Sequence, residues 1–178
     1  GSAFYSCPGY RLPTEYEWEY AARSGSSHSF WTADGGGDLI NGDYCESGSQ
    51  IDDGAGSPYL GDYAWYCGNS SERLQDVATK APNAFGVYDM HGNSFEWVED
   101  WSSEWCYDSV NCNTFPYQYN PDPYGPPSGT YKIVRGGSTS YASLSTSSIR
   151  EIKSPTISYC FRPGEEFFGA RLVRTVSP

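Results

Sequence analysis

One short helix near the amino terminus is the feature that most constrains how this 178-residue chain folds. Thr14 followed by Glu17 is a capping-box pattern, and Pro13 stops the residues before it from being helical. The pattern predicts a helix from Glu15 to Arg23. Its apolar residues recur at helical spacing, so we expect Trp18 to be a core residue rather than a ligand contact.

Regular structure is sparse in the rest of the sequence. Residues 24–75 are rich in Gly, Asp, Ser and Asn and show neither a helical nor a strand period, which predicts long excursions in which only residues 63–66 are buried. Phe95, Trp97 and Trp101 predict a strand with one buried face. Residues 131–135 and 169–174 are further strand candidates, and the five prolines between positions 102 and 129 predict a surface loop. We expect one loop-rich α+β domain spanning residues 1–178.

The charge balance and hydropathy exclude two classes of partner. The net charge is −11, and eleven Lys and Arg residues cannot form the basic stripe that releases counterions from a nucleic acid. No run of about 18 apolar residues exists, so direct membrane insertion is not expected. The acidity is consistent with solubility alone or with sites for a hard cation such as calcium.

The six cysteines favour disulfide bonds over a metal site. None stands in a CxxC pair or beside a histidine at zinc-ligand spacing. Cys106 and Cys112 are candidates for one bridge, and Cys45 and Cys67 for a second. An even number of cysteines without metal spacing favours an oxidising compartment.

Two acidic segments are candidate cation sites. Asp89 and Glu96 flank a Gly-Asn turn whose carbonyls could join their carboxylates around one calcium ion, although both side chains could equally accept hydrogen bonds from turn amides. His91 lies between them and is a candidate general base, but a histidine near a turn is the preferred interpretation. The second segment has no fixed spacing and is better explained as a solvated loop; its acidic residues are Asp34, Asp38, Asp43, Glu46, Asp52 and Asp53.

A hydroxyl-rich segment follows Gly137. Thirteen of the twenty-two residues from Ser138 to Tyr159 carry a hydroxyl group, which makes the segment too polar for a core. Ser, Thr and Tyr are favoured where a surface makes adaptable hydrogen bonds and rigid aromatic contacts, as in antibody paratopes. The segment therefore predicts a binding surface.

Three blocks of sequence resemble a known family. Residues 11–23, residues 86–97 and the Arg-Gly-Gly-Ser motif at 135–138 are similar to the formylglycine-generating, sulfatase-modifying proteins. The resemblance runs from about Cys7 to Arg174 and implies a variant of the C-type lectin fold that lacks the family's N-terminal segment. It also implies a structural calcium site with side-chain ligands at Asp89 and Glu96 and carbonyl ligands at Gly92 and Ser94.

The family's catalytic residues do not carry over. Its oxidase chemistry depends on two copper-binding cysteines shortly after the Arg-Gly-Gly-Ser motif, and these positions hold Tyr141 and Thr146 here. Neither residue can act as a thiolate ligand. We therefore expect no copper and no enzymatic activity; the alternative is a copper-dependent formylglycine-generating oxidase or a related modifying enzyme on the same fold.

The hydroxyl-rich segment also resembles the variable region of diversity-generating retroelement proteins, some of which use this scaffold. The resemblance implies a variable ligand-binding region over residues 138–168, in which Glu151, Lys153, Glu165 and Glu166 are fixed. The candidate ligand-binding residues are Ser140, Tyr141, Ser143, Ser145, Thr146, Thr156, Ser158, Tyr159, Phe161, Arg162 and Phe167.

These residues lead to a functional hypothesis. We expect a non-enzymatic receptor or adhesion domain at a cell or virion surface that binds a protein rather than a carbohydrate. Aromatic and arginine side chains tend to dominate binding energy, so the expected anchors are Tyr141, Tyr159, Phe161 and Arg162. A purely structural accessory domain is a third possibility.

Overall fold

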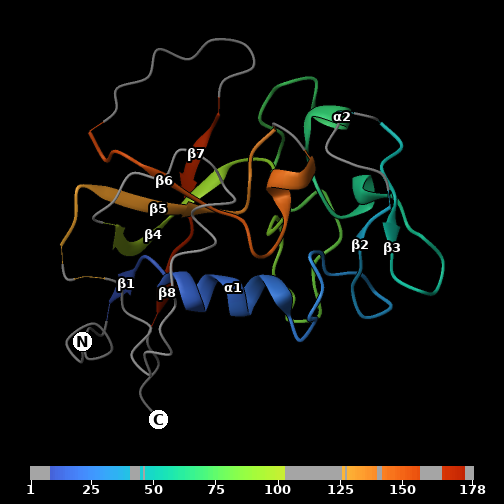
Figure 1. The fold of residues 1–178 in the computed structure, drawn as a ribbon, viewed down its shortest axis with the longest axis horizontal. Coiled ribbons are helices and arrows are strands. Elements are labelled where there is room, and N and C mark those ends of the chain that lie inside the picture. Colours follow the sequence, from blue (N-terminus) through green and yellow to red (C-terminus); the bar gives the residue numbers. More distant parts are fainter. Residues whose placement is uncertain are drawn as a thin grey trace.

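A four-stranded sheet packed against one helix forms one half of the fold (Figure 1). The computed structural model describes residues 9–40, 45, 47–102, 126, 128–139, 142–156 and 166–174. The strand order is β6-β5-β4-β7, and only the β4–β7 pair is parallel. Helix α1 (Glu15–Arg23) packs against β4 and β5. The four strands are β4 (Phe95–Ser102), β5 (Tyr131–Arg135), β6 (Arg150–Lys153) and β7 (Phe168–Ala170).

The predicted helix is confirmed at both ends. The Thr14 hydroxyl accepts a hydrogen bond from the Glu17 amide at 3.2 Å, and the Glu17 carboxylate accepts one from the Thr14 amide at 2.9 Å. This reciprocal arrangement satisfies two backbone donors at the helix start. At the other end, Ser24 adopts a left-handed conformation and its amide donates to Tyr20. Trp18 is 1% exposed, as expected for a core residue.

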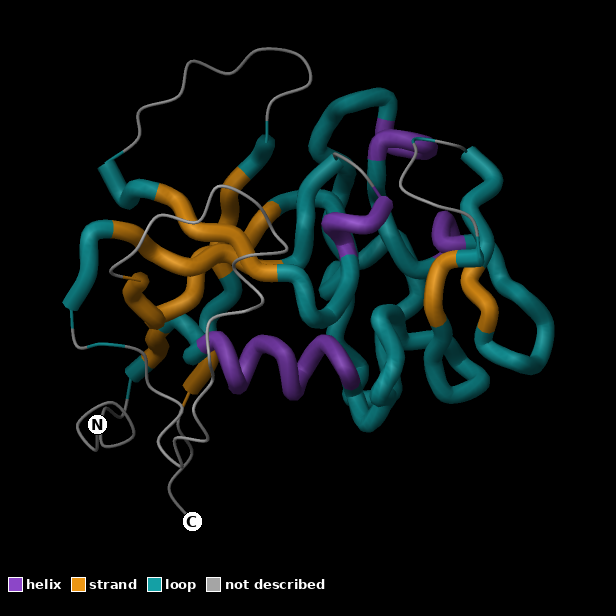
Figure 2. The backbone as a smooth tube through the Cα atoms, in the orientation of Figure 1, coloured by secondary structure: helices purple, strands orange, loops and turns teal. Residues whose placement is uncertain are grey.

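Short elements make up the other half of the fold, as Figure 2 shows. Strands β1 (Tyr10–Arg11) and β8 (Val173–Arg174), which pair near the two ends of the described chain, lie instead on the side of the four-stranded sheet, by the start of α1 (Figure 1). Strands β2 (Asp38–Leu39) and β3 (Ile51–Asp52) form a small hairpin. The remaining elements are η1 (Leu60–Asp62), α2 (Cys67–Ser70) and η2 (Ala142–Ser145). None of the helices in these described ranges is long and apolar enough to cross a membrane.

Two apolar clusters stabilise these halves. The first lies between α1 and the four-stranded sheet and contains Trp18, Ala22, Met90, Val98, Ile133 and Ile152. The second lies under the glycine-rich excursion and contains Phe30, Ile51, Leu60, Ala64, Tyr66 and Ala142. The excursion therefore buries more than the predicted segment 63–66, because single apolar residues from separate turns converge on one cluster.

A disulfide bond joins Cys45 to Cys67 across this second half. The bond confirms the predicted Cys45–Cys67 pair and ties the excursion to the start of α2. The other candidate pair, Cys106 and Cys112, lies outside the described residues.

Two predicted strands differ from the structure. Val98 rather than Trp97 joins the cluster between the sheet and α1, because the even-numbered residues of β4 face the helix: Glu96 accepts from Trp18 and Asp100 accepts from the Glu15 amide. Phe95 and Trp97 face the other side of the sheet, where both pack against Phe168 of β7, so the strand alternates as predicted but its helix-facing side is the opposite one. The candidate strand 169–174 is two strands, since β7 pairs with β4 while β8 pairs with β1.

Candidate functional site

The hydroxyl-rich segment leaves the sheet through two glycines. Gly136 and Gly137 follow β5 with φ angles of 92° and 75°, in the left-handed region that favours glycine. A Cβ atom on Gly137 would lie 2.4 Å from the carbonyl oxygen of Leu144, so only glycine lets η2 fold back this closely. The Arg-Gly-Gly-Ser motif therefore places the segment directly against the sheet end.

Side chains from outside the segment hold its backbone. The Nδ1 atom of His91 lies 2.8 Å from the carbonyl oxygen of Ser145. Arg135 donates to the carbonyl oxygens of Ser147 at 2.7 Å and Ser148 at 2.9 Å. The Ser147 amide donates to the Ser29 carbonyl at 2.7 Å. The conformation of residues 145–148 is thus fixed mainly by framework groups.

Arg135 belongs to a buried ion cluster at the base of this segment. Its guanidinium, 1% exposed, donates to Glu15 at 3.2 Å and to Glu19 at 2.6 Å. Arg150 pairs with the other Glu15 oxygen. The cluster joins α1, β5 and β6. Sequence reasoning missed it, although Glu15 and Glu19 stand one helical turn apart beside the buried Trp18.

His91 is buried inside the fold, which does not suit the general base considered above. Its Nε2 atom accepts a hydrogen bond from the Trp31 amide at 3.3 Å, and its ring packs 5.2 Å from that of Phe30. An acceptor at Nε2 requires the proton on Nδ1, which then donates to Ser145. Burial lowers the pKa of His91 from 6.5 to about 4. The neutral ring therefore serves as a connector between two loops.

The candidate ligand-binding residues occupy different environments. Ser143, Thr146 and Phe167 are half-buried, and Thr156 is exposed. Ser145 is buried with Ser147, and neither hydroxyl has a hydrogen-bond partner among the described residues. The expectation that this segment is too polar for a core is wrong for these two serines and for Ser138 and Thr139, which are buried as well. Small hydroxyl side chains can be buried where the backbone around them is hydrogen-bonded. The other candidates lie outside the described residues: Ser140, Tyr141, Ser158, Tyr159, Phe161 and Arg162.

An ion triad joins two residues of the segment, Glu151 and Lys153, to Glu166 beyond it. Lys153 contacts Glu151 at 2.7 Å and Glu166 at 2.6 Å, which joins β6 to the residue preceding β7 by two. Burial raises the pKa of Glu151, while the two carboxylates raise the pKa of Lys153 against its own burial. Three of the four residues expected to be fixed therefore form one ion triad, in which both carboxylates pair with Lys153.

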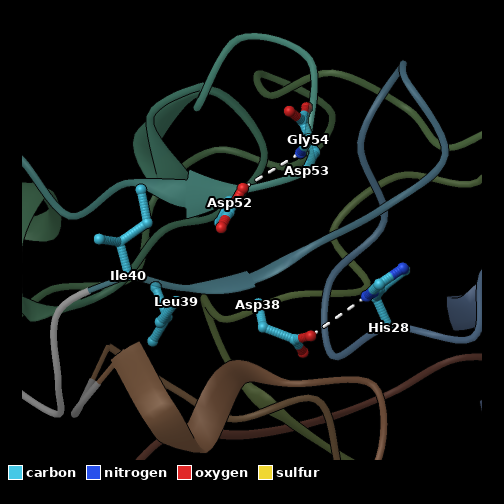
Figure 3. Close-up of a pocket in the computed structure, with 7 residues that line it drawn as sticks. All are labelled: His28, Asp38, Leu39, Ile40, Asp52, Asp53 and Gly54. Carbon is cyan, nitrogen blue, oxygen red and sulfur yellow. Dashed lines mark hydrogen bonds and ion pairs between the residues drawn. The ribbon is translucent and has the colours of Figure 1, made fainter.

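A cavity of about 530 Å³ lies beside the segment, at the β2–β3 hairpin (Figure 3). Leu39, which lines it, packs against the cluster that contains Ala142 of η2. Ser29 donates to Asp38 of the cavity and accepts from Ser147 of the segment. The lining residues are His28, Asp38, Leu39, Ile40, Asp52, Asp53 and Gly54. Three residues of the second acidic segment, Asp38, Asp52 and Asp53, thus line this cavity and accept hydrogen bonds there.

The four expected calcium ligands lie in the loop before β4 and at the start of that strand, but their oxygens are unequally available. Both oxygens of Glu96 accept hydrogen bonds, from Trp18 and Arg171. The Gly92 carbonyl accepts from the Ser94 amide at 2.9 Å. Asp89 accepts from the Ala78 amide through Oδ2, while its buried Oδ1 has no partner in the described chain. No group of three His, Cys, Asp or Glu side chains suited to a metal forms within the described ranges.

Comparison with known proteins decides the family. The sequence model of one protein family, the sulfatase-modifying factor enzyme 1-like domain, matches residues 2–176 of this chain. This chain belongs to that family. Its α+β architecture, with few helices and short strands in curled sheets, is the C-type lectin-like fold of the sulfatase-modifying type.

The curated proteins that this chain resembles include a protein kinase and a formylglycine-generating enzyme. The chain is 33% identical over 139 residues to the serine/threonine-protein kinase Pkn1 of Chlamydia trachomatis, covering 77% of this chain and 17% of that protein. It is 30% identical over 152 residues to the formylglycine-generating enzyme of Streptomyces coelicolor, covering 77% and 38%. The chain thus spans less than half the length of these curated relatives.

A solved structure extends the likeness over nearly the whole chain. Treponema denticola variable protein 1 superposes with a TM-score of 0.60 and 30% identity, covering 94% of this chain and 48% of that one. PvdO from Pseudomonas aeruginosa has the same fold at 24% identity, with a TM-score of 0.59 over 93% and 52% of the two chains. Proteins with different names, and not formylglycine-generating enzymes alone, therefore share this fold.

Proposed function

We propose that this domain binds a protein ligand without catalysing a reaction. The observation that carries the proposal is the hydroxyl-rich turn: framework side chains hold its backbone, and several of its own side chains point into partly or fully exposed environments. Such an arrangement lets side chains change without loss of the fold. The likeness to a protein named variable protein 1 supports the same interpretation.

The binding face extends over the segment and its surroundings. Exposed Ser148 and Thr156 lie in the segment, and the cavity at the β2–β3 hairpin adjoins it through Ser29 and Leu39. The paratope-like composition favours a protein over a carbohydrate, because tyrosine and serine supply adaptable contacts at low entropic cost. A cell-surface or virion-surface location is part of the proposal, and the Cys45–Cys67 disulfide suits such an oxidising environment.

Natural variation tests the proposal directly. Gene copies from sibling isolates should differ chiefly between codons 139 and 168, at exposed positions such as Ser148 and Thr156. The ion triad around Lys153 should be spared, because loss of one member would leave half-buried charges without their partner. Substitutions spread evenly along the gene would contradict a variable binding face.

A binding measurement complements the sequence comparison. Peptide phages selected on the wild-type domain should lose affinity when Tyr141, Tyr159, Phe161 and Arg162 are all changed to alanine. A control with alanine at Tyr16 and Tyr20, which are 62% and 64% exposed on α1, should bind the same phages as well as wild type does. Equal binding by the two variants, both folded by circular dichroism, would reject the proposed face.

Two adjacent serines provide a matched test of the display geometry. Ser148→Tyr should change the free energy of unfolding by less than about 0.5 kcal/mol, because residue 148 is exposed. Ser147→Tyr should destabilise by about 2 kcal/mol, because residue 147 is fully buried and a large ring overpacks the site. Urea unfolding of both variants measures the difference. Similar losses for the two would show that the turn does not separate buried from displayed side chains.

The competing function is the oxidase of the formylglycine-generating relatives. A purified domain incubated with copper, oxygen and a cysteine-containing peptide should give no formylglycine product by mass spectrometry, because Tyr141 and Thr146 cannot supply thiolates to copper. A formylglycine-generating enzyme assayed in parallel serves as the positive control. Appearance of the product with this domain would replace the binding proposal by catalysis.

A further inference from the structure

Arg171 lies in the turn between β7 and β8 and reaches the loop where calcium was expected. Its Nε donates to Glu96 Oε2 at 2.9 Å and its Nη2 donates to Glu96 Oε1 at 2.8 Å. The same Nη2 donates to the carbonyl oxygen of Tyr88 at 2.9 Å and lies 3.5 Å from that of Asp89. One guanidinium thus faces two carboxylate and two carbonyl oxygens.

This set of partners is of the kind that a hard cation gathers. Calcium takes six to eight oxygens from carboxylates and backbone carbonyls. Arginine can bind a smaller number of carboxylate and carbonyl oxygens in the same way. Its planar guanidinium donates two hydrogen bonds to one carboxylate, and its charge is permanent. We infer that Arg171 supplies the cation of the 88–96 loop in place of calcium.

The occupancy of Glu96 supports the inference. Its Oε2 accepts from both Arg171 and the indole Nε1 of Trp18, the latter at 2.7 Å. Its side chain is 12% exposed, so little water competes for these bonds. A divalent ion on this carboxylate would stand beside a guanidinium of the same sign. Among the expected ligands, Asp89 is the other carboxylate that could offset the added charge, and one of its oxygens already accepts from Ala78.

The arrangement also explains how distant segments are joined. Trp18 of α1, Glu96 of β4 and Arg171 after β7 meet at one carboxylate, so the helix, the central strand and the β7–β8 turn share a single set of hydrogen bonds. A tethered arginine makes this junction independent of dissolved metal. A calcium ion would make it depend on the calcium concentration.

Thermal unfolding with and without calcium tests the inference on the wild-type domain. The melting temperature in about 5 mM CaCl2 and in EDTA should agree within about 1 °C, because no bound ion adds stability. Isothermal titration with CaCl2 should show no saturable heat. A rise of about 3 °C or more with calcium, or a saturating isotherm, would overturn the inference without any variant.

Variants test the arginine itself. Arg171→Gln should lower the melting temperature by about 5 °C, because Glu96 loses its charged partner while still largely buried. Arg171→Lys should recover only part of that loss, because an ammonium cannot bridge both Glu96 oxygens at once. An Arg171→Gln variant as stable as wild type would also overturn the inference.

Arg174→Gln is the matched control for charge. Arg174 lies on β8 and is exposed, so this change alters the net charge equally but should shift the melting temperature by less than about 1 °C. These measurements concern the loop at Glu96 and not the hydroxyl-rich face. Their failure would leave the proposed binding function standing, and failure of the binding tests would leave Arg171 unaffected.

Discussion

Changing Arg135 to methionine should destabilise the domain by about 3 to 5 kcal/mol, the usual cost of removing one partner from a buried ion pair. Methionine keeps much of the volume beside the Trp18 ring, which lies 5.3 Å from the guanidinium carbon. The change removes the charge that faces Glu15, whose side chain is only 4% exposed. It also leaves the Ser147 and Ser148 carbonyls without their donor.

The measurement is the free energy of unfolding from urea denaturation, with Arg23→Met as the control. Arg23 forms an i,i+4 pair with Glu19 at 2.8 Å, but its side chain is 28% exposed. Exposed helix pairs of this kind contribute only about 0.3 to 0.5 kcal/mol. Equal effects of the two substitutions would contradict a buried ion cluster beneath the hydroxyl-rich segment.

The Arg135 variant also tests how the segment is held. If Arg135 fixes the turn, amides of residues 145–148 should exchange with solvent faster in the variant than those of α1. Loss of stability without selective loss of protection there would mean that Arg135 stabilises the core but does not position the turn.

Acidification from pH 6.5 to pH 4 should cost about 3 kcal/mol through His91 alone. Burial holds the folded pKa of this histidine at about 4, below its unfolded value of 6.5. Between these values the unfolded chain binds a proton that the native chain excludes, so stability rises with pH across this window. The contribution of His91 is fully present above pH 6.5, falls as the pH drops, and changes little below about pH 4.

The same protonation has a structural consequence. A proton on Nε2 would point at the Trp31 amide, which is itself a donor, so the bond that joins the two loops would be lost. The test compares pH profiles of the unfolding free energy for wild type and His91→Gln, because the difference cancels the carboxylates shared by both. His28→Gln, a change at an exposed histidine, serves as the control. Parallel profiles for wild type and His91→Gln would contradict this assignment.

Local patterns predicted those parts of the fold that local interactions form. The helix at 15–23 was predictable because its capping box lies within four residues of sequence. The pairing of Cys45 with Cys67 was one of the options that cysteine spacing allowed, and the structure selects it. The strand after Phe95 was located, but the face that meets α1 was not, because that face is set by the helix packed against the strand.

The candidate site was predicted less completely. The sequence pointed to residues 138–168 through composition alone, and composition cannot separate Ser147 from Ser148, which differ in burial because of the turn between them. Arg135 and Arg171 were not singled out, since the carboxylates that they pair with lie 116 or more residues from Arg135 and 75 residues from Arg171 in the chain. Contacts between residues so far apart in the chain produce no periodic pattern that a single sequence could reveal.

Residue types at short, fixed spacing were enough to predict the helix with its N-terminal cap and to indicate the family. Folding was needed to establish which serines are displayed, why His91 stays neutral, and which cation faces Glu96. These last properties depend on burial and on partners from distant segments, because hydrogen bonds and charges act over a few ångströms in space whatever the separation along the chain.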